Sequence, residues 1–140
     1  QYIQLEMTES VMAVESEACL ELLNGLKELG ISVAIDDFGT GYSSLSYLTK
    51  FPVDTLKIDY SFITNLPDDN DSATVTSGII ALAHKLRMNV IAEGVETLAQ
   101  REFLQHELCD AIQGYSISRP LPAKEFEDWI KSYEPVTASK

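Results

Sequence analysis

Short runs of apolar residues alternate along this chain with longer segments in which apolar residues recur at helical spacing. The short runs predict strands at about 2–7, 31–36, 54–58, 88–93 and 110–114. The longer segments predict helices at about 16–29, 42–50, 72–87, 97–107 and 122–133. Runs such as 31–35 are almost continuously apolar, which is typical of strands covered on both faces in a parallel sheet. The pattern therefore predicts an α/β fold made of repeated strand–helix units.

Sequence signals at the helix ends support these boundaries. Gly30 follows the segment 16–29, and glycine commonly ends helices because it tolerates a left-handed backbone. Either Asp71 or Ser72 is expected to cap the helix at 72–87. Thr97 and Gln100 have the spacing of a capping box, which predicts a helix start at 97.

The length of the repeating unit indicates the kind of parallel fold. Five units in 140 residues give 28 residues per unit. Eight such units would take about 224 residues, which fits the roughly 200–250 residues of a (β/α)8 barrel. We therefore expect a partial (β/α)8 TIM-type barrel of about five βα units, formed by residues 1–133 as the C-terminal portion of a domain, with a disordered tail at 134–140. Because the sequence begins with Gln1, we expect a segment of a longer protein.

Composition narrows the choice of partners. The formal net charge of −12 argues against binding to long nucleic acids, which relies on Lys and Arg. The apolar runs are far shorter than the roughly 20 residues that a membrane helix needs, so we expect no membrane contact by this segment and a cytoplasmic location. Cys19 and Cys109 are interpreted as buried thiols of a reducing compartment. His84 and His106 fall on predicted helices, away from the strand ends, and are interpreted as surface or interface residues.

Acidic residues stand at the carboxyl ends of the predicted strands. In a (β/α)8 barrel the active site lies at this edge, so these side chains are expected to converge. Converging carboxylates repel one another and are costly to desolvate, and a pair of divalent metal ions would compensate them. The residues concerned are Glu6, Asp36, Asp37, Asp59 and Glu93.

The most specific stretch starts with Asp36 and Asp37 and continues through a glycine-rich loop to Ser44. Adjacent carboxylates at a strand end point in different directions, so one can bridge two metal ions while its neighbour binds one. Gly39 and Gly41 permit backbone angles closed to other residues and let the loop pass near a ligand. The alternative is an Asx turn followed by a helix cap.

Two residues are candidates for supporting roles beside these acids. Glu9 could tether the glycine-rich loop through its backbone N–H groups, or it could be a solvent-exposed acid or a charge at a helix N-terminus. Lys57 interrupts an apolar strand and would face the acids, where it could orient a metal-bound water or offset developing phosphate charge. A structural salt bridge with Asp59 is the alternative. A Schiff-base role is disfavoured because nearby acids would keep the amine charged and poorly nucleophilic.

The last two strand ends supply further polar groups. Glu93 is placed as a metal ligand or as a base that acts through water. Glu96 follows it across a glycine and is placed to support the site or contact substrate. Gln113 offers an amide to the edge of a nucleobase.

Taken together, these stretches resemble the EAL-domain family of bacterial cyclic di-GMP phosphodiesterases. The resemblance runs from Gln1 to about Trp129. It implies a (β/α)8 barrel with one strand reversed, which cuts one phosphodiester bond of cyclic di-GMP to give linear pGpG and needs Mg2+ or Mn2+. The matching motifs are 5–10 (LEMTES), 36–45 (DDFGTGYSSL), 56–59 (LKID), 91–96 (IAEGVE), 113–115 (QGY) and 118–122 (SRPLP).

The resemblance also implies which residues carry the chemistry. Glu6, Asp36 and Asp37 look like metal ligands, and Glu93 resembles the acid that holds a metal ion or its water. Lys57 resembles the lysine beside the attacking water. The residues expected to be catalytic are therefore Lys57, Glu93 and Asp37.

The same resemblance assigns binding roles. Glu96 and Gln113 look like residues that line the substrate site. Glu9 resembles the acid that steadies the glycine-rich loop, which in the family also serves at a dimer interface. We therefore expect cyclic di-GMP as a partner, and self-association through that loop region or through strand edges exposed at 2–7 and 110–114.

The sequence departs from the family in one respect. The Glu-Ala-Leu tripeptide that names the family, whose glutamate binds metal, does not occur here, and an asparagine ligand and an arginine belong to the same absent region. We therefore expect the two-metal site to be incomplete, the parent protein to be a phosphodiesterase, and this chain alone to be inactive or nearly so. The alternative is a non-catalytic module of the same fold that binds cyclic di-GMP or a protein.

Overall fold

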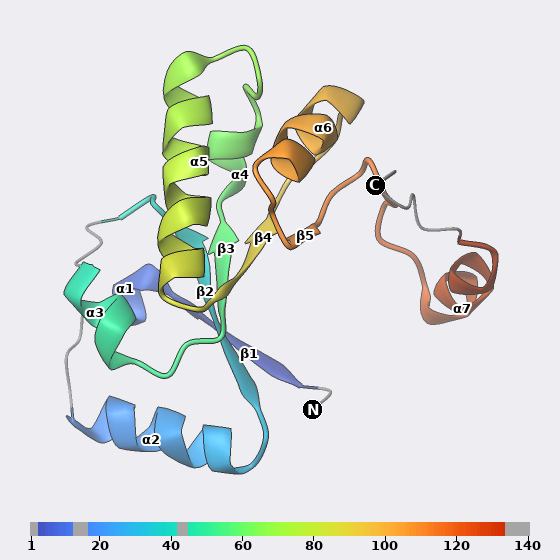
Figure 1. Cartoon of the computed structure of the whole chain (residues 1–140). Coiled ribbons are helices and arrows are strands. Elements are labelled where there is room, and N and C mark those ends of the chain that lie inside the picture. Colours follow the sequence, from blue (N-terminus) through green and yellow to red (C-terminus); the bar gives the residue numbers. More distant parts are fainter. Residues whose placement is uncertain (1–2, 13–16, 42–44, 134–140) are drawn as a thin grey trace.

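The computed structural model describes residues 3–12, 17–41 and 45–133. Within them, five parallel strands form one sheet in the order β1-β2-β3-β4-β5 (Figure 1). All five predicted strands are confirmed, although the last is shorter than expected. The strands are β1 (Gln4–Thr8), β2 (Ser32–Phe38), β3 (Thr55–Ile58), β4 (Asn89–Ala92) and β5 (Ala111–Ile112).

The predicted helices are also present, and two single-turn helices join them. The sequence did not predict α1 (Glu9–Met12) and α4 (Tyr60–Ile63), because four residues are too few to show an apolar period. The longer helices are α2 (Glu17–Glu28), α3 (Leu45–Lys50), α5 (Asn70–Lys85), α6 (Leu98–His106) and α7 (Ala123–Ser132).

The cap of α5 differs from the prediction. Asp69, rather than Asp71 or Ser72, is the capping residue, and its Oδ2 accepts a hydrogen bond from Ser72 N at 2.8 Å. The helix therefore begins two residues earlier than the apolar spacing suggested. The capping box of Thr97 at the start of α6 is confirmed.

Burial separates the central strands from the edge strands. All four residues of β3 are buried, as are Val33, Ala34 and Ile35 in β2. In β1, Met7 is the single buried residue, and β5 has none. The almost continuous apolar runs were thus correctly interpreted as strands covered on both faces.

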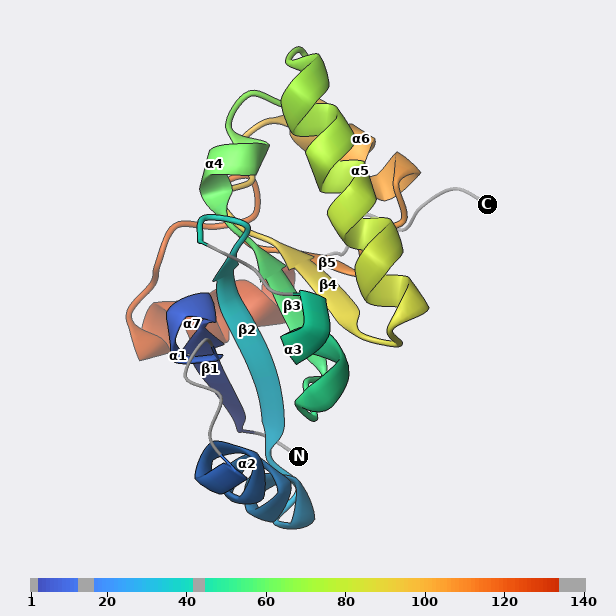
Figure 2. The ribbon, with the colours of Figure 1, turned by 90° about the vertical axis from the view of Figure 1, so that its left-hand side faces the viewer.

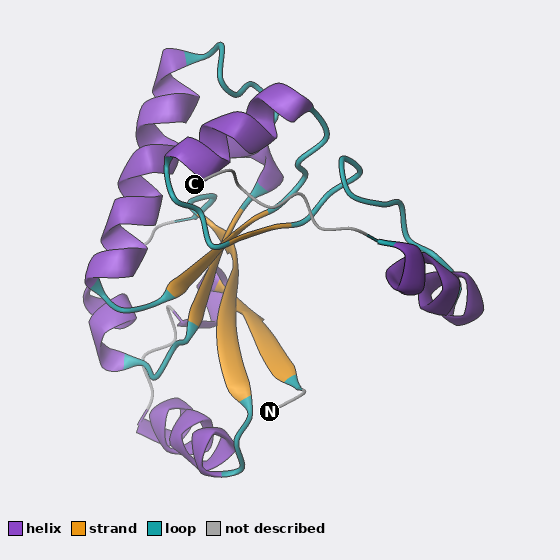
Figure 3. Ribbon diagram, turned by 45° about the vertical axis from the view of Figure 1, so that its right-hand side comes forward, coloured by secondary structure: helices purple, strands orange, loops and turns teal. Residues whose placement is uncertain are grey.

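Helices α2, α3, α5 and α6 gather on one side of the sheet, while α7 stands apart on the other side (Figures 2 and 3). No residue of α7 is buried by the described parts of the chain. Its aromatic residues contact one another and Tyr133, which follows the helix, with ring centroids 5.8 Å apart for Phe126 and Trp129 and 4.6 Å apart for Trp129 and Tyr133. The core therefore lies between the sheet and the other helices.

Several remaining predictions can be compared with the structure. Cys19 and Cys109 form no disulfide, and both are half-buried rather than fully buried; burial raises the pKa of Cys109 to about 11. His84 lies on the surface, away from the carboxyl ends of the strands as expected, and contacts Asp110 before the start of β5. None of the described helices is both long and apolar enough to cross a membrane. The expected tail at 134–140 and residues 42–44, where the predicted helix at 42–50 begins, lie outside the described residues.

Candidate metal centre

Lys57 lies among carboxylates at the carboxyl-terminal edge of the sheet. Its side chain is 5% exposed, and Nζ lies 2.9 Å from Glu6 Oε2, 2.8 Å from Asp36 Oδ1 and 2.9 Å from Glu93 Oε1. Glu6 belongs to β1, Asp36 to β2 and Lys57 to β3, and Glu93 directly follows β4. Four adjacent parallel strands therefore bring these groups to one point.

The surroundings of Lys57 fix its charge. Burial by itself lowers the pKa of Lys57, but the adjacent carboxylates of Asp36, Glu6 and Glu93 outweigh burial and raise that pKa above its ordinary value. The amine is therefore protonated at neutral pH and poorly nucleophilic, in line with the argument against a Schiff base. Asp59 is not an ion-pair partner of Lys57 among the described residues; it caps α4 by accepting a hydrogen bond from Ser61 N at 3.0 Å.

Asp36, Asp37 and Glu93 form a tighter group, in which each offers a carboxylate oxygen within 4.8 Å of the other two. Consecutive residues of a regular strand point to opposite faces, so adjacent aspartates were expected to diverge. However, the register between β2 and β3 shifts between Ile35 and Phe38, and Asp37 has a φ of 53°. Such an irregularity re-aims side chains, and here it brings both aspartates to one group.

The donor set fits a hard divalent cation. Carboxylate oxygens are the ligands that Mg2+ and Mn2+ prefer. Asp36 Oδ1 is buried. Among the described residues it forms an ion pair with the ammonium of Lys57, but it accepts no hydrogen bond of good geometry. A desolvated oxygen of this kind is well suited to a metal ion. Glu6 is not a member of the group of three, and its side chain is 46% exposed.

The glycine-rich loop is attached to α1 by Glu9. Its Oε2 accepts a hydrogen bond from Gly39 N at 3.2 Å, and a Cβ at Gly41 would lie 3.4 Å from the Glu9 carboxylate. Gly39 has a φ of 98°, and a Cβ there would lie 2.7 Å from the ring of Phe62. Glycine is therefore needed at Gly39 both for its backbone angle and for close packing.

Glu96 and Gln113 line a cavity of about 590 Å³, which Gly94 also lines. Tyr60 of α4 and Tyr115 after β5 also line it. Sequence reasoning did not identify these two tyrosines as site residues, because single aromatic residues in loops carry no periodic signal.

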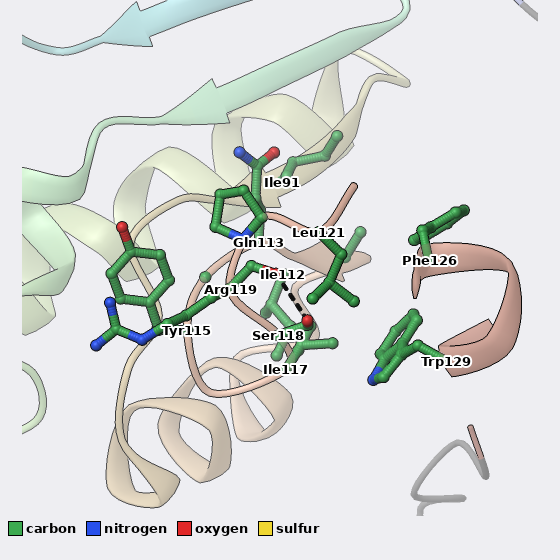
Figure 4. Close-up of a pocket in the computed structure, with 13 residues that line it drawn as sticks. Ile91, Ile112, Gln113, Tyr115, Ile117, Ser118, Arg119, Leu121, Phe126 and Trp129 are labelled. Atoms are coloured by element: carbon green, nitrogen blue, oxygen red, sulfur yellow. Dashed lines mark hydrogen bonds between the residues drawn. The ribbon is translucent and has the colours of Figure 1, made fainter. Parts of the chain in front are cut away.

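A second cavity, of about 510 Å³, lies between β5 and α7 and is mostly apolar (Figure 4). Gln113 lines this cavity as well as the first. The guanidinium of Arg119 lies 4.4 Å from the ring centroid of Tyr115, in cation–π contact. Because Gln113 lines both cavities, it lies where they meet.

The fold and the acidic edge define an α/β domain of the barrel type. The family model of the EAL domain matches residues 1–120, and the chain belongs to that family. The cyclic di-GMP phosphodiesterase NbdA of Pseudomonas aeruginosa is 46% identical over 132 residues, which are 94% of this chain and 17% of NbdA.

Solved structures agree with this assignment. The PaMucR phosphodiesterase in complex with c-di-GMP has a TM-score of 0.82 at 46% identity, over 88% of this chain and 50% of that one. BlrP1 of Klebsiella pneumoniae, solved with manganese and cyclic di-GMP, has a TM-score of 0.77 at 33% identity, over 84% of this chain and 30% of BlrP1. The predicted fold class is confirmed, and the chain spans half or less of the length of each of these proteins.

Proposed function

We propose that the protein to which this chain belongs hydrolyses cyclic di-GMP to linear pGpG and uses Mg2+ or Mn2+. The observation that carries this proposal is the convergence of Glu6, Asp36 and Glu93 on Lys57, beside Asp37, at the carboxyl-terminal edge of the sheet. The relatives that are named phosphodiesterases, and the cyclic di-GMP and manganese of the solved complexes, support the choice of substrate and metal.

Asp36, Asp37 and Glu93 are the metal ligands in this proposal, with Glu6 as a further ligand. When bound, the metal ions supply Lewis-acid activation of water and of the phosphodiester. Lys57 holds its ammonium within 2.9 Å of three of these acids, where it can donate to the attacking water or to phosphoryl oxygen as negative charge develops.

The remaining candidates position the substrate and the loop. Glu93, beyond its part in holding metal, can accept a proton through water. Glu96 and Gln113 contact the substrate from the cavity of about 590 Å³, and the Gln113 amide can pair with the edge of a guanine. Glu9 steadies the glycine-rich loop through Gly39 N.

We further propose that the 140-residue chain alone turns over little or no substrate. Glu6 lies on an edge strand with 46% of its side chain exposed, and the Glu-Ala-Leu glutamate is absent from this sequence. The open edges of β1 and β5 favour self-association of the isolated chain. Two cysteines that form no disulfide suit the reducing cytoplasm, where we place the protein.

The test compares this chain with a complete EAL domain that contains it. Each is incubated with cyclic di-GMP and either Mn2+ or EDTA, and pGpG is measured by chromatography. We expect pGpG from the complete domain with Mn2+ and none with EDTA. A complete domain that forms no pGpG would overturn the phosphodiesterase assignment, and efficient turnover by the chain alone would overturn the proposed incompleteness.

A non-catalytic module that binds cyclic di-GMP is the second candidate. It is favoured by the contacts of Lys57, which partly neutralise the acidic cluster without any metal. Isothermal titration of the complete domain separates the two functions. Binding of cyclic di-GMP without turnover in the presence of Mn2+ would establish the module.

A further inference from the structure

The side chain of Gln100 joins the loop at 93–97 to the end of α4. It is 4% exposed. Its Oε1 accepts hydrogen bonds from Glu96 N at 2.8 Å and from Thr97 N at 2.9 Å. Its Nε2 donates to Ile63 O at 3.1 Å and to Thr64 O at 3.3 Å. The amide therefore uses both acceptor lone pairs and both N–H groups.

The capping box explains only half of these contacts. A glutamate serves as well as a glutamine at this position of a capping box, because only an acceptor is needed. A glutamate could not donate to the carbonyl oxygens of Ile63 and Thr64. The amide of Gln100 therefore has two roles: it caps the start of α6, and it links α6 to the end of α4.

One of the two linked segments carries acids of the site, and the other comes shortly after the strand that holds Lys57. The loop at 93–97 holds Glu93 and Glu96, and α4 follows directly from the strand that holds Lys57. Gly94 has a φ of 70°, and a Cβ there would lie 2.6 Å from Cβ of Tyr60. The loop at 93–97 therefore packs closely against α4 at Tyr60, and the Gln100 amide holds the two segments in this arrangement.

We propose that Gln100 is a positioning residue for phosphodiester cleavage. It holds Glu93 at 2.9 Å from Lys57 and keeps Glu96 at the cavity wall, and so acts through these residues rather than on the reacting atoms. This inference rests on the proposed phosphodiesterase function. To the residues of that proposal, the inference adds the buried amide of Gln100, which sets the positions of Glu93 and Glu96.

The substitution Gln100→Glu tests the link, because it keeps the acceptor of the capping box and removes the two donors. Gln105→Glu is the matched control, since Gln105 is exposed on the same helix and the change in charge is identical. In the complete EAL domain, we expect Gln100→Glu to lower kcat about 10- to 100-fold and to raise the Mn2+ concentration for half-saturation in direct binding titrations about tenfold. We expect KM to change less than about threefold, and Gln105→Glu to behave as the wild type.

Three results would overturn the inference. The first is a folded Gln100→Glu variant with wild-type kcat and Mn2+ binding. The second is a loss of activity that merely follows the folded fraction seen by circular dichroism, which would make the role structural. The third needs no variant: amide hydrogen exchange of Glu96 and Thr97 in the wild-type domain at the rate of an unstructured peptide would show that the link does not form. Failure of the proposed function is distinct, because the wild-type domain itself would then show no metal-dependent cleavage.

Discussion

The two ends of the sheet accommodate acidic residues in opposite ways. At the carboxyl end, carboxylates from three places in the fold share the single ammonium of Lys57. At the amino end, Asp54 and Asp110 each have a cationic or titratable partner of their own. The first arrangement keeps an excess of negative charge, whereas in the second each carboxylate has a partner of its own.

The amino-end arrangement occurs twice with the same geometry. Asp54 directly precedes β3, accepts a hydrogen bond from Val33 N of β2 at 2.8 Å and forms an ion pair with Lys27 in the last turn of α2. In each case, an aspartate connects the strand that it precedes to the neighbouring strand and to the helix that leads into that neighbour.

The second instance lies two strands further along the sheet. Asp110 directly precedes β5, accepts a hydrogen bond from Val90 N of β4 at 2.8 Å and lies 2.9 Å from His84 Nε2 in the last turn of α5. In barrel folds the carboxyl-terminal face carries catalysis and the opposite face carries stability. The contrast in charge balance follows this division, because a surplus of carboxylates is useful only where a ligand or metal compensates it.

The strongest test of this contrast is Lys57→Met. We expect kcat of the complete domain to fall about 10²- to 10³-fold, because a preorganised cation is lost. We also expect the metal-free protein to lose about 1–3 kcal/mol of unfolding free energy, since Glu6, Asp36 and Glu93 lose a shared cation and are partly screened by water. Mn2+ should raise the Tm of this variant more than that of the wild type, which thermal unfolding with and without Mn2+ measures.

Lys27→Met makes the same chemical change at the amino end and is the control. We expect it to cost about 1 kcal/mol or less, to leave kcat unchanged and to show no extra response to Mn2+. An equal gain in Tm from Mn2+ in both variants would contradict a difference between the two ends.

The next largest effect is expected for Asp54→Ala. The substitution leaves the N–H of Val33, on a fully buried residue, without its acceptor, and should cost about 1–3 kcal/mol of unfolding free energy. Denaturant unfolding measures the loss. At temperatures below the Tm of the variant, its kcat in the complete domain should equal that of the wild type. Asp54→Asn keeps an acceptor and should recover part of the stability. If Asp54→Asn were as unstable as Asp54→Ala, the loss of this hydrogen bond would not explain the destabilisation.

The carboxyl end of the sheet was far easier to predict from the sequence than the amino end. Apolar runs located the strands, and the acids that follow them could be named at once, because parallel strands bring their carboxyl ends to one edge. Asp54 and Asp110 gave no such signal. Their acceptor roles involve backbone N–H groups 21 and 20 positions away, which no side-chain pattern records.

Local irregularities set a second limit on prediction. The shift in register that turns Asp37 towards Glu93 depends on pairing between β2 and β3 and cannot be read from either strand alone. Gln100 was correctly predicted as a capping residue, but its bonds to Ile63 and Thr64 reach 37 and 36 positions back along the chain. Sequence periodicity thus gives the elements, while long-range hydrogen bonds decide how loops meet.

The smallest expected effect concerns Asp110 and depends on pH. Burial raises the pKa of Asp110, but hydrogen bonds from His84 and Val90 N outweigh it and hold the pKa below its ordinary value. A carboxyl of this kind stabilises the fold above its unfolded pKa of about 3.9, and the contribution is lost as pH falls through the lower folded value. Asp110→Ala leaves the N–H of Val90 without its acceptor, as Asp54→Ala does for Val33, and the pH-dependent part of its cost should be about 0.5–1 kcal/mol at neutral pH and shrink below about pH 4.

His84→Gln separates charge from hydrogen bonding in this pair. Glutamine can still donate to Asp110 but carries no charge, so any gap in stability between this variant and the wild type should shrink as salt screens the half-exposed groups. Urea unfolding at a series of pH values and at two salt concentrations provides both readouts. If the deficit of Asp110→Ala stayed constant down to pH values well below about 3.9, the ionised carboxylate would not be its source.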